Sequence, residues 1–149
     1  MRTSRIVGVI TAALVAVGGY VHLCLYRHGY RYIPKIGVSF LLQVIASVAV
    51  AVLLIVGPRI VARIAHLTEG AAATTMHLAT LSLGAGTLVA FALTRTSAGL
   101  FNFRERGLQP SPQALLALGA EAAVVLLTSA ELFTDHIRAH RHVRAVRPV

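Results

Sequence analysis

The sequence predicts an all-α integral membrane protein, a four-helix bundle of up-down topology with short interfacial helices. Apolar residues make up 56% of the 149-residue chain and charged residues 13%, against about 25% charged residues in soluble domains. The apolar residues gather in four runs of about 20 residues, the length that a helix needs to cross ~30 Å of hydrocarbon. None of these runs alternates apolar and polar residues strictly, so helices rather than strands are expected.

The predicted spans are residues 6–26, 36–56, 71–93 and 114–133. Backbone amides find no water in hydrocarbon, which restricts spanning segments to helices and closed barrels. The first run resembles a signal peptide but continues to Leu25, too far for a typical signal. We therefore expect an uncleaved first span and a single four-span domain over residues 1–149.

The connections between the spans differ in character. The first, residues 27–35, is short and is closed by Pro34, which suits the first turn of the second helix. The third, residues 94–113, is the longest. Beyond the last span, residues 135–149 form a basic tail that we expect to be cytoplasmic.

The second connection, "GPRIVARIAHLTEG" at residues 57–70, separates apolar from basic side chains at helical spacing. This pattern predicts a short amphipathic helix that lies in the plane of the membrane interface. The apolar stripe is Ile60, Ile64 and Leu67, and the basic stripe is Arg59, Arg63 and His66.

The basic residues predict the orientation in the plasma membrane. An even number of spans places both termini on one side, and the side richer in Lys and Arg is usually cytoplasmic. The net charge is +9, but the basic residues lie between and beyond the apolar runs, so anionic lipid headgroups rather than nucleic acid are the expected partner. Eight lie on the side of the termini (Arg2, Arg5, Arg59, Arg63, Arg138, Arg141, Arg144, Arg147) and six on the other (Arg27, Arg31, Lys35, Arg95, Arg104, Arg106).

Small residues recur at four-residue spacing in three of the spans. Such rows allow helix backbones to approach closely inside a membrane. They indicate a compact bundle and are compatible with contacts to other membrane subunits or to a second copy of the chain. The rows are Gly8, Ala12 and Ala16, then Ser82, Gly86 and Ala90, then Gly119 and Ala123.

Four polar side chains inside the spans are predicted to lie at similar depth in the outer half: His22, Gln43, Thr87 and Glu121. Polar groups are costly in hydrocarbon and are the first functional candidates there. One interpretation is a proton-exchange or ligand site, since an imidazole beside a carboxylate can share its proton. The other is a hydrogen-bonded network that fixes helix register. Glu121 is the strongest candidate, because it lies about eight residues inside its span.

A second group of candidates forms a basic and aromatic patch on the outer face. The tyrosines are typical of the aromatic belt at a membrane interface, and the cations beside them could reach lipid phosphates. Within the third connection, "GLFNFRERG" either dips into the interface or covers the polar layer. The patch comprises Tyr26, Arg27, Tyr30, Arg31, Lys35, Arg104 and Arg106.

No metal or cofactor is predicted. The chain lacks the CxxC and HExxH spacings of zinc sites. His22 and His77 are expected in opposite halves of the membrane, so they could not ligate one haem. His136, His140 and His142 alternate with arginines and are interpreted as a solvated basic face.

The segments "HLCLYRHGYRYIPKIG", "FLLQVIA" and "GLFNFRERG", together with an acid in the last span, resemble small four-span membrane proteins of GC-rich Gram-positive bacteria. The resemblance covers most of the chain. It implies the four-span topology and implies no activity.

Three functions remain open, and an enzyme is the less expected outcome. The first is an accessory or structural subunit of a larger membrane complex. The second is a proton-coupled carrier that uses His22 and Glu121, although the chain is short and lacks the repeats common in transporters. The third is a small enzyme or redox protein acting on a lipid or quinone at the outer face, with Cys24, His22 and Tyr26 as participants.

Overall fold

The computed structural model describes residues 2–145, and the side chains of residues 5–138. The described chain is helical, and four of its helices are long and apolar enough to cross a membrane, which confirms the predicted fold class. The elements are α1 (Arg2–Arg27), the 3-10 turn η1 (Tyr30–Tyr32), α2 (Ile36–Val56), α3 (Pro58–Ala65), α4 (Glu69–Thr94) and α5 (Gln113–Ala145).

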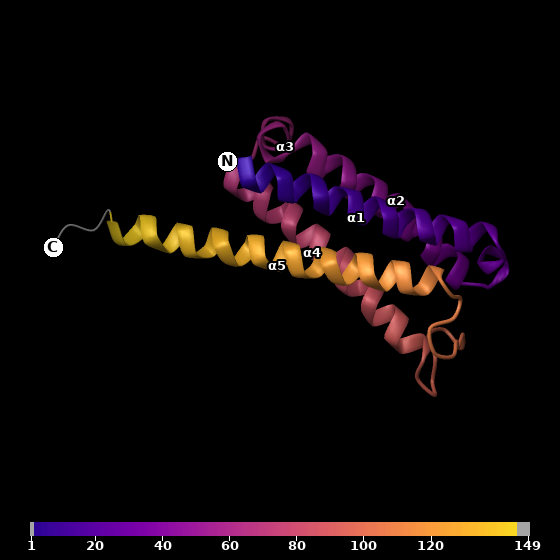
Figure 1. Ribbon diagram of the computed structural model, residues 1–149. Coiled ribbons are helices and arrows are strands. Elements are labelled where there is room, and N and C mark those ends of the chain that lie inside the picture. Colours follow the sequence, from indigo (N-terminus) through magenta and orange to yellow (C-terminus); the bar gives the residue numbers. More distant parts are fainter. Residues whose placement is uncertain (1, 146–149) are drawn as a thin grey trace.

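The helix α1 lies between α2 and α5 and packs on both, whereas α4 packs mainly on α5. The helix α4 crosses α5 and diverges from α1 and α2 as it leaves the end where the N-terminus and α3 lie (Figure 1). We call that end inner, after the predicted orientation, and the opposite end outer.

The core of the bundle is apolar and made of small side chains. Ala12 and Val15 of α1 meet Val50 and Ala51 of α2 and Val124 of α5. Small residues suit this position, because helices in lipid associate through close packing rather than through the hydrophobic effect.

Close helix approach depends on glycines other than those in the predicted rows. A Cβ on Gly19 would lie 2.7 Å from the Cβ of Ser47, and a Cβ on Gly18 would lie 2.7 Å from Oε1 of Glu121. In contrast, a Cβ on Gly86 or Gly119 would meet nothing within 4 Å. Four-residue spacing identified small residues correctly but not the face of the helix that packs.

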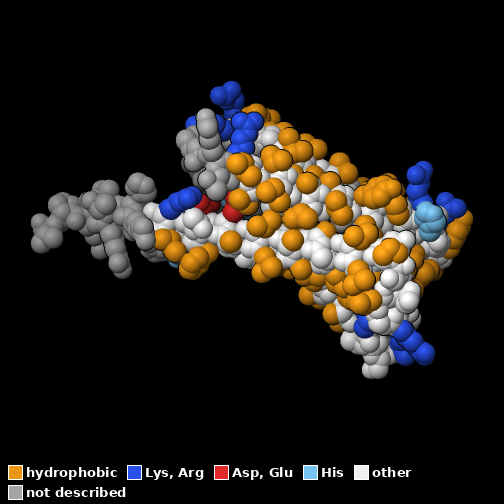
Figure 2. Space-filling view, viewed as in Figure 1, with side chains coloured by type: hydrophobic (Ala, Val, Ile, Leu, Met, Phe, Trp, Pro, Cys, Tyr) orange, Lys and Arg blue, Asp and Glu red, His pale blue; other side chains and the backbone are white. Residues whose placement is uncertain are grey.

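The surface has the distribution expected of a membrane protein. Large apolar side chains are exposed along all four long helices, among them Val9, Leu42, Val89 and Leu126. Figure 2 shows hydrophobic side chains over the middle of one face, with Lys and Arg toward both ends. The chain is therefore a multi-pass membrane protein by its architecture. Of the arginines counted at the inner end, the side chains of Arg2, Arg141, Arg144 and Arg147 lie outside the described residues.

The predicted interfacial helix is present as α3. Pro58 occupies its first turn, and His66 ends it in the left-handed conformation at φ 54°. Ile60 and Ile64 are exposed on its apolar stripe, as a helix lying on a membrane surface requires. Leu67 and His66 follow the helix rather than belong to it. The next helix, α4, is capped at its start by Thr68, whose hydroxyl accepts a hydrogen bond from the amide of Ala71 at 3.1 Å.

The second span has its predicted bounds, Ile36–Val56. Pro34 precedes this helix rather than lying in its first turn, because Lys35 has a positive φ of 66° that cannot continue a helix. At the other end, α5 runs without interruption from the last span through Ala145 and projects beyond the bundle (Figure 1). The side chains of His140 and His142 lie outside the described residues.

We predict that Gly19→Ala destabilises the protein, because the new methyl group would overlap Ser47 on α2. Overpacking of this kind costs about 1–3 kcal/mol. Gly119→Ala is the matched control, since its methyl group has open space and alanine favours the helix by about 1 kcal/mol. Thermal unfolding in detergent measures both variants, and equal melting temperatures would contradict the packing described here.

Candidate functional site

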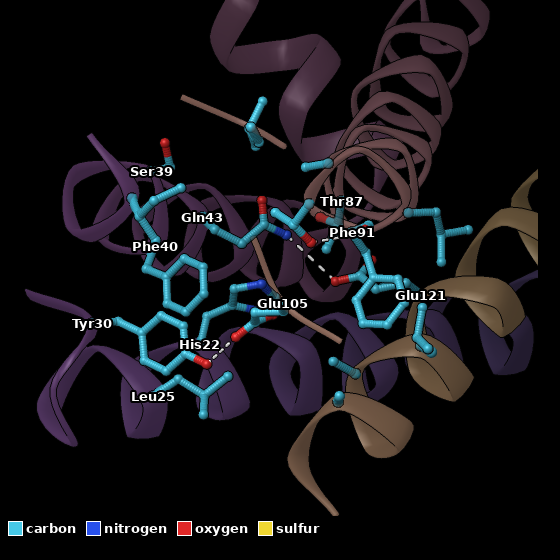
Figure 3. Close-up of a pocket in the computed structure, with 18 of the residues that line it drawn as sticks. His22, Leu25, Tyr30, Ser39, Phe40, Gln43, Thr87, Phe91, Glu105 and Glu121 are labelled. Atoms are coloured by element: carbon cyan, nitrogen blue, oxygen red, sulfur yellow. Dashed lines mark hydrogen bonds between the residues drawn. The ribbon is translucent and has the colours of Figure 1, made fainter. Parts of the chain in front are cut away.

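A cavity of about 170 Å³ lies in the outer half of the bundle, where α4 diverges from α2. Side chains of α1, α2, α4 and α5 line it, together with the first and third connections (Figure 3). Most of the lining is apolar. The volume of the cavity is comparable to that of an engineered apolar cavity of about 150 Å³ that holds benzene, so a small molecule fits.

The structure places all four members of the predicted polar layer on this cavity. His22 comes from α1, Gln43 from α2, Thr87 from α4 and Glu121 from α5. Each of the four long helices therefore contributes at least one polar side chain to a mostly apolar chamber. What this arrangement does chemically depends on Glu121, the one acid among them.

Glu121 is 3% exposed, and its carboxylate lies between two glycines. Oε1 faces Gly18 of α1 and Oε2 faces Gly84 of α4, where a Cβ would lie 2.7 and 3.3 Å away. The amide of Gln43 donates a hydrogen bond to Oε1 at 3.4 Å (Figure 3). That distance exceeds the usual 2.7–3.2 Å, and a carboxylate can accept about four hydrogen bonds. The hydrogen-bonding capacity of the Glu121 carboxylate is therefore only partly used.

The other acids of the chain all have basic partners within 4 Å, whereas Glu121 has none among the described side chains. A buried carboxylate without a compensating positive charge is strongly unfavourable. One positive charge, carried by a proton or by a ligand, must therefore accompany Glu121. The four pairs are Arg59–Glu69, Arg95–Glu105, His77–Glu131 and Arg138–Asp135, at 3.5, 3.0, 3.3 and 3.5 Å.

The polar atoms left free to face a ligand are mainly acceptors. Nδ1 of His22 lies 2.8 Å from the carbonyl oxygen of Gly18, so Nδ1 carries the proton and Nε2 of the neutral ring is an acceptor. The hydroxyl of Thr87 donates to the carbonyl of Leu83 at 2.9 Å. With the carboxylate of Glu121, these groups favour an occupant that donates hydrogen bonds or carries positive charge.

Aromatic rings line the outer part of the cavity. Phe40 stacks on Tyr30 with ring centroids 4.8 Å apart, and His22 meets the same phenylalanine edge-on at 5.1 Å. Phe103 packs edge-on against Tyr30 at 5.9 Å. Phe91 of α4 completes the set, and the guanidinium of Arg95 covers one face of its ring, 3.4 Å from the centroid. The faces of aromatic rings attract cations, so these rings complement the charge of Glu121.

Arg95 and Glu105 close the cavity at its outer end. Their side chains are 17% and 15% exposed and pair at 3.0 Å, and the hydroxyl of Tyr30 donates to Glu105 (Figure 3). Arg95 also donates to the carbonyls of Gly107 and Gln109 at 3.0 and 2.6 Å. Tyr30, Arg95 and Glu105, here called the roof, join the first connection, the end of α4 and the third connection.

The predicted basic and aromatic patch is only partly a surface feature. Arg27, Arg31, Lys35, Arg104 and Arg106 are exposed, whereas Tyr26 is partly buried. Tyr30 lies in the roof rather than in an aromatic belt. Lys35 lies 5.5 Å from the ring centroid of Phe101, so a contact across the two outer connections supports the roof. Cys24 and Tyr26 are absent from the side chains that line the cavity.

Glu105, Arg95 and the two glycines beside Glu121 were missed as site residues. Glu105 stands between two arginines in "RER", a pattern typical of a solvated loop. One sequence signal was available for α1, because Gly18–Gly19 is the only pair of adjacent glycines in the chain. No group of three or more His, Cys, Asp or Glu within the described part of the chain could hold a metal ion. No protein family, curated protein or solved structure matches this chain.

The roof predicts a shifted titration for Tyr30. Burial, and then the hydrogen bond and negative charge of Glu105, raise the pKa of the Tyr30 phenol above its ordinary value. Because the folded protein keeps this proton, the stabilisation is complete below pH ~10 and is lost as the pH rises above it.

An alkaline titration followed by ultraviolet absorbance in detergent tests this assignment. One of the four tyrosines should ionise after the others, and Tyr30→Phe should remove that late phase. Glu105→Gln should move the phase to lower pH, since the carboxylate charge is lost. A late phase that persists in Tyr30→Phe would contradict the assignment.

Proposed function

We propose that the protein is a proton-coupled carrier for small lipophilic cations, in which a proton and the cation compete for Glu121. The observation that carries the proposal is the buried carboxylate of Glu121, which lines the cavity and has no basic partner among the described residues. A proton and a cation both neutralise this carboxylate, and repulsion between the two positive charges disfavours holding them together. Binding of one therefore releases the other.

The chemistry of the cavity supports an ammonium-type ligand. Aromatic rings of Tyr30, Phe40, Phe91 and Phe103 surround the space, and aromatic cages are suited to quaternary and protonated amines. The only Lys or Arg in the lining is Arg95, which pairs with Glu105. Its guanidinium also lies over the ring of Phe91, 3.4 Å from the centroid. A cationic ligand would therefore meet negative charge at Glu121 and the ring faces that Arg95 leaves free.

The quinone-type alternative has weaker support. Quinone carbonyls accept hydrogen bonds, whereas the free polar atoms of His22 and Thr87 are acceptors themselves. A protonated Glu121 would have to act as the donor beside the amide of Gln43. The accessory-subunit role and the resemblance to bacterial four-span proteins stay predictions, as does the cytoplasmic location of both termini. A carrier could still act as part of a larger membrane complex.

We predict that benzyltrimethylammonium binds the purified protein and releases about one proton per cation, since a single carboxylate exchanges them. This probe has an aromatic ring and a fixed charge, so every proton released comes from the protein. Binding should weaken as the pH is lowered, because protons compete for Glu121. Equilibrium dialysis measures the binding, and a pH indicator in weak buffer measures the protons.

Glu121→Gln should abolish both the binding and the proton release, because it removes the charge while keeping a similar shape. Glu69→Gln is the matched control, since Glu69 is an exposed acid that pairs with Arg59 far from the cavity. If Glu121→Gln binds the cation as tightly as the unmodified protein does, the proposed function is wrong.

A further inference from the structure

Four buried side-chain atoms have no hydrogen-bond partner among the described residues, and each of the four long helices contributes one of them. They are the hydroxyls of Thr11, Ser47 and Thr128 and Nδ1 of His77. A buried polar atom without a partner costs about 1–3 kcal/mol and calls for an explanation.

Ser47 lies at the depth of Glu121. The glycines of α1 establish this, because Gly18 faces the carboxylate of Glu121 and its neighbour Gly19 faces Ser47, whose Oγ would lie 3.2 Å from an added Cβ. The first unpartnered hydroxyl thus lies beside the proposed exchange site.

Thr11 and Thr128 lie at a common, deeper level of the bundle. Helices α1 and α5 are antiparallel, and Gly18 faces Glu121. Seven residues toward the inner end lead from Gly18 to Thr11 and from Glu121 to Thr128, a distance of about 10 Å along each helix. Both side chains are 1% exposed.

Thr80 of α4 reaches the same level. The pair His77–Glu131 joins α4 and α5 at 3.3 Å. Three residues toward the outer end, Thr80 follows His77 on α4 and Thr128 precedes Glu131 on α5. Thr80 is 0% exposed, and its hydroxyl donates to the carbonyl of Met76 at 2.8 Å. Thr11, Thr80 and Thr128 therefore form a hydroxyl layer contributed by three helices.

The missing hydrogen bonds of Thr11 and Thr128 are unusual for this chain. Threonines in helices commonly donate to a carbonyl one turn earlier, and Thr80, Thr87 and Thr134 all do so. Thr74 and Thr75 of α4 also lack such a bond, but both are exposed. Thr11 and Thr128 are the buried exceptions, and both lie in the hydroxyl layer, where their hydroxyls remain available to water or to one another.

A cluster of one histidine and two acids lies one helical turn from the hydroxyl layer, toward the inner end. His77 is 14% exposed and contacts Glu131 at 3.3 Å and Asp135 at 3.9 Å. Asp135 in turn pairs with exposed Arg138. The other charged pair near the start of α4 is Arg59–Glu69. His77 and Glu131 are thus the titratable groups that meet the hydroxyl layer from the inner side.

We propose that His77 and Glu131 form an inner proton-exchange site that the hydroxyl layer links to Glu121. This inference rests on the proposed function and gives the proton of Glu121 a route to the inner end. Each relay oxygen, of a hydroxyl or of a water molecule, accepts one proton as it releases another. The inner site gains the proton that Glu121 loses, and no electrons are transferred.

The apolar core interrupts this route. Val15 and Val124, both almost fully buried, occupy the section between Glu121 and the hydroxyl layer. Apolar surroundings do not hold water in a stable position, so protons pass only when this section is transiently hydrated. The barrier keeps proton movement dependent on the occupant of Glu121.

The test uses the full-length protein in liposomes that contain a pH-sensitive dye. A benzyltrimethylammonium gradient should drive protons in the opposite direction, and Thr128→Val should reduce this flux to that of protein-free liposomes. Cation binding in detergent should be unchanged. Thr128→Ser should restore the flux, and Thr134→Val, which removes a hydroxyl outside the layer, should leave it intact.

Stability separates a relay from a merely structural role. Because the hydroxyl of Thr128 has no partner, Thr128→Val should keep or raise the melting temperature. Unchanged flux in Thr128→Val, or loss of flux together with binding and melting temperature, overturns the inner route. Binding with proton release but without transmembrane proton movement in the unmodified protein overturns both the inner route and the carrier function, whereas flux that is unchanged in Thr128→Val overturns the inner route alone. Retained binding in Glu121→Gln refutes the proposed function itself.

Discussion

The accommodation of one carboxylate inside an apolar bundle governs the organisation of the outer half of this protein. Glu121 requires space, a hydrogen bond and a compensating positive charge. Gly18 and Gly84 supply the space because neither has a side chain to displace the carboxylate. Gln43 supplies a long hydrogen bond. No described residue supplies the positive charge. A proton or a cationic ligand must therefore supply it, which makes the surroundings of Glu121 a candidate exchange site.

The remaining architecture of the outer half isolates that carboxylate. Helix α4 diverges from α2 and opens the cavity, and the roof of Tyr30, Arg95 and Glu105 closes its outer end. An ion pair that is mostly buried interacts more strongly than an exposed one, so the roof is a firm connection between two loops. On the inner side, Val15 and Val124 separate the cavity from the hydroxyl layer. The polar groups of the bundle therefore form distinct levels rather than one continuous channel.

Several local features could be anticipated because their causes are local. The lengths of the spans follow from the thickness of hydrocarbon, and α3 follows from the spacing of Ile60, Ile64, Arg59 and Arg63. The common depth of His22, Gln43, Thr87 and Glu121 follows from counting residues at a fixed rise. Of the predicted rows of small residues, Ala12 lies in the core whereas Gly86 and Gly119 have open space beside them, since spacing along one helix does not reveal which face its neighbours cover.

The sequence by itself determined the helical class, the four spans and the depth of each polar side chain, because hydrophobicity and helical rise are properties of single segments. Only the tertiary structure decided that Glu121 lacks a basic partner, that Glu105 and Tyr30 close the cavity, and that Thr11, Thr80 and Thr128 share one level. These relations depend on the rotation and crossing of helices far apart in the chain. Such geometry is set by mutual packing, which no single segment encodes.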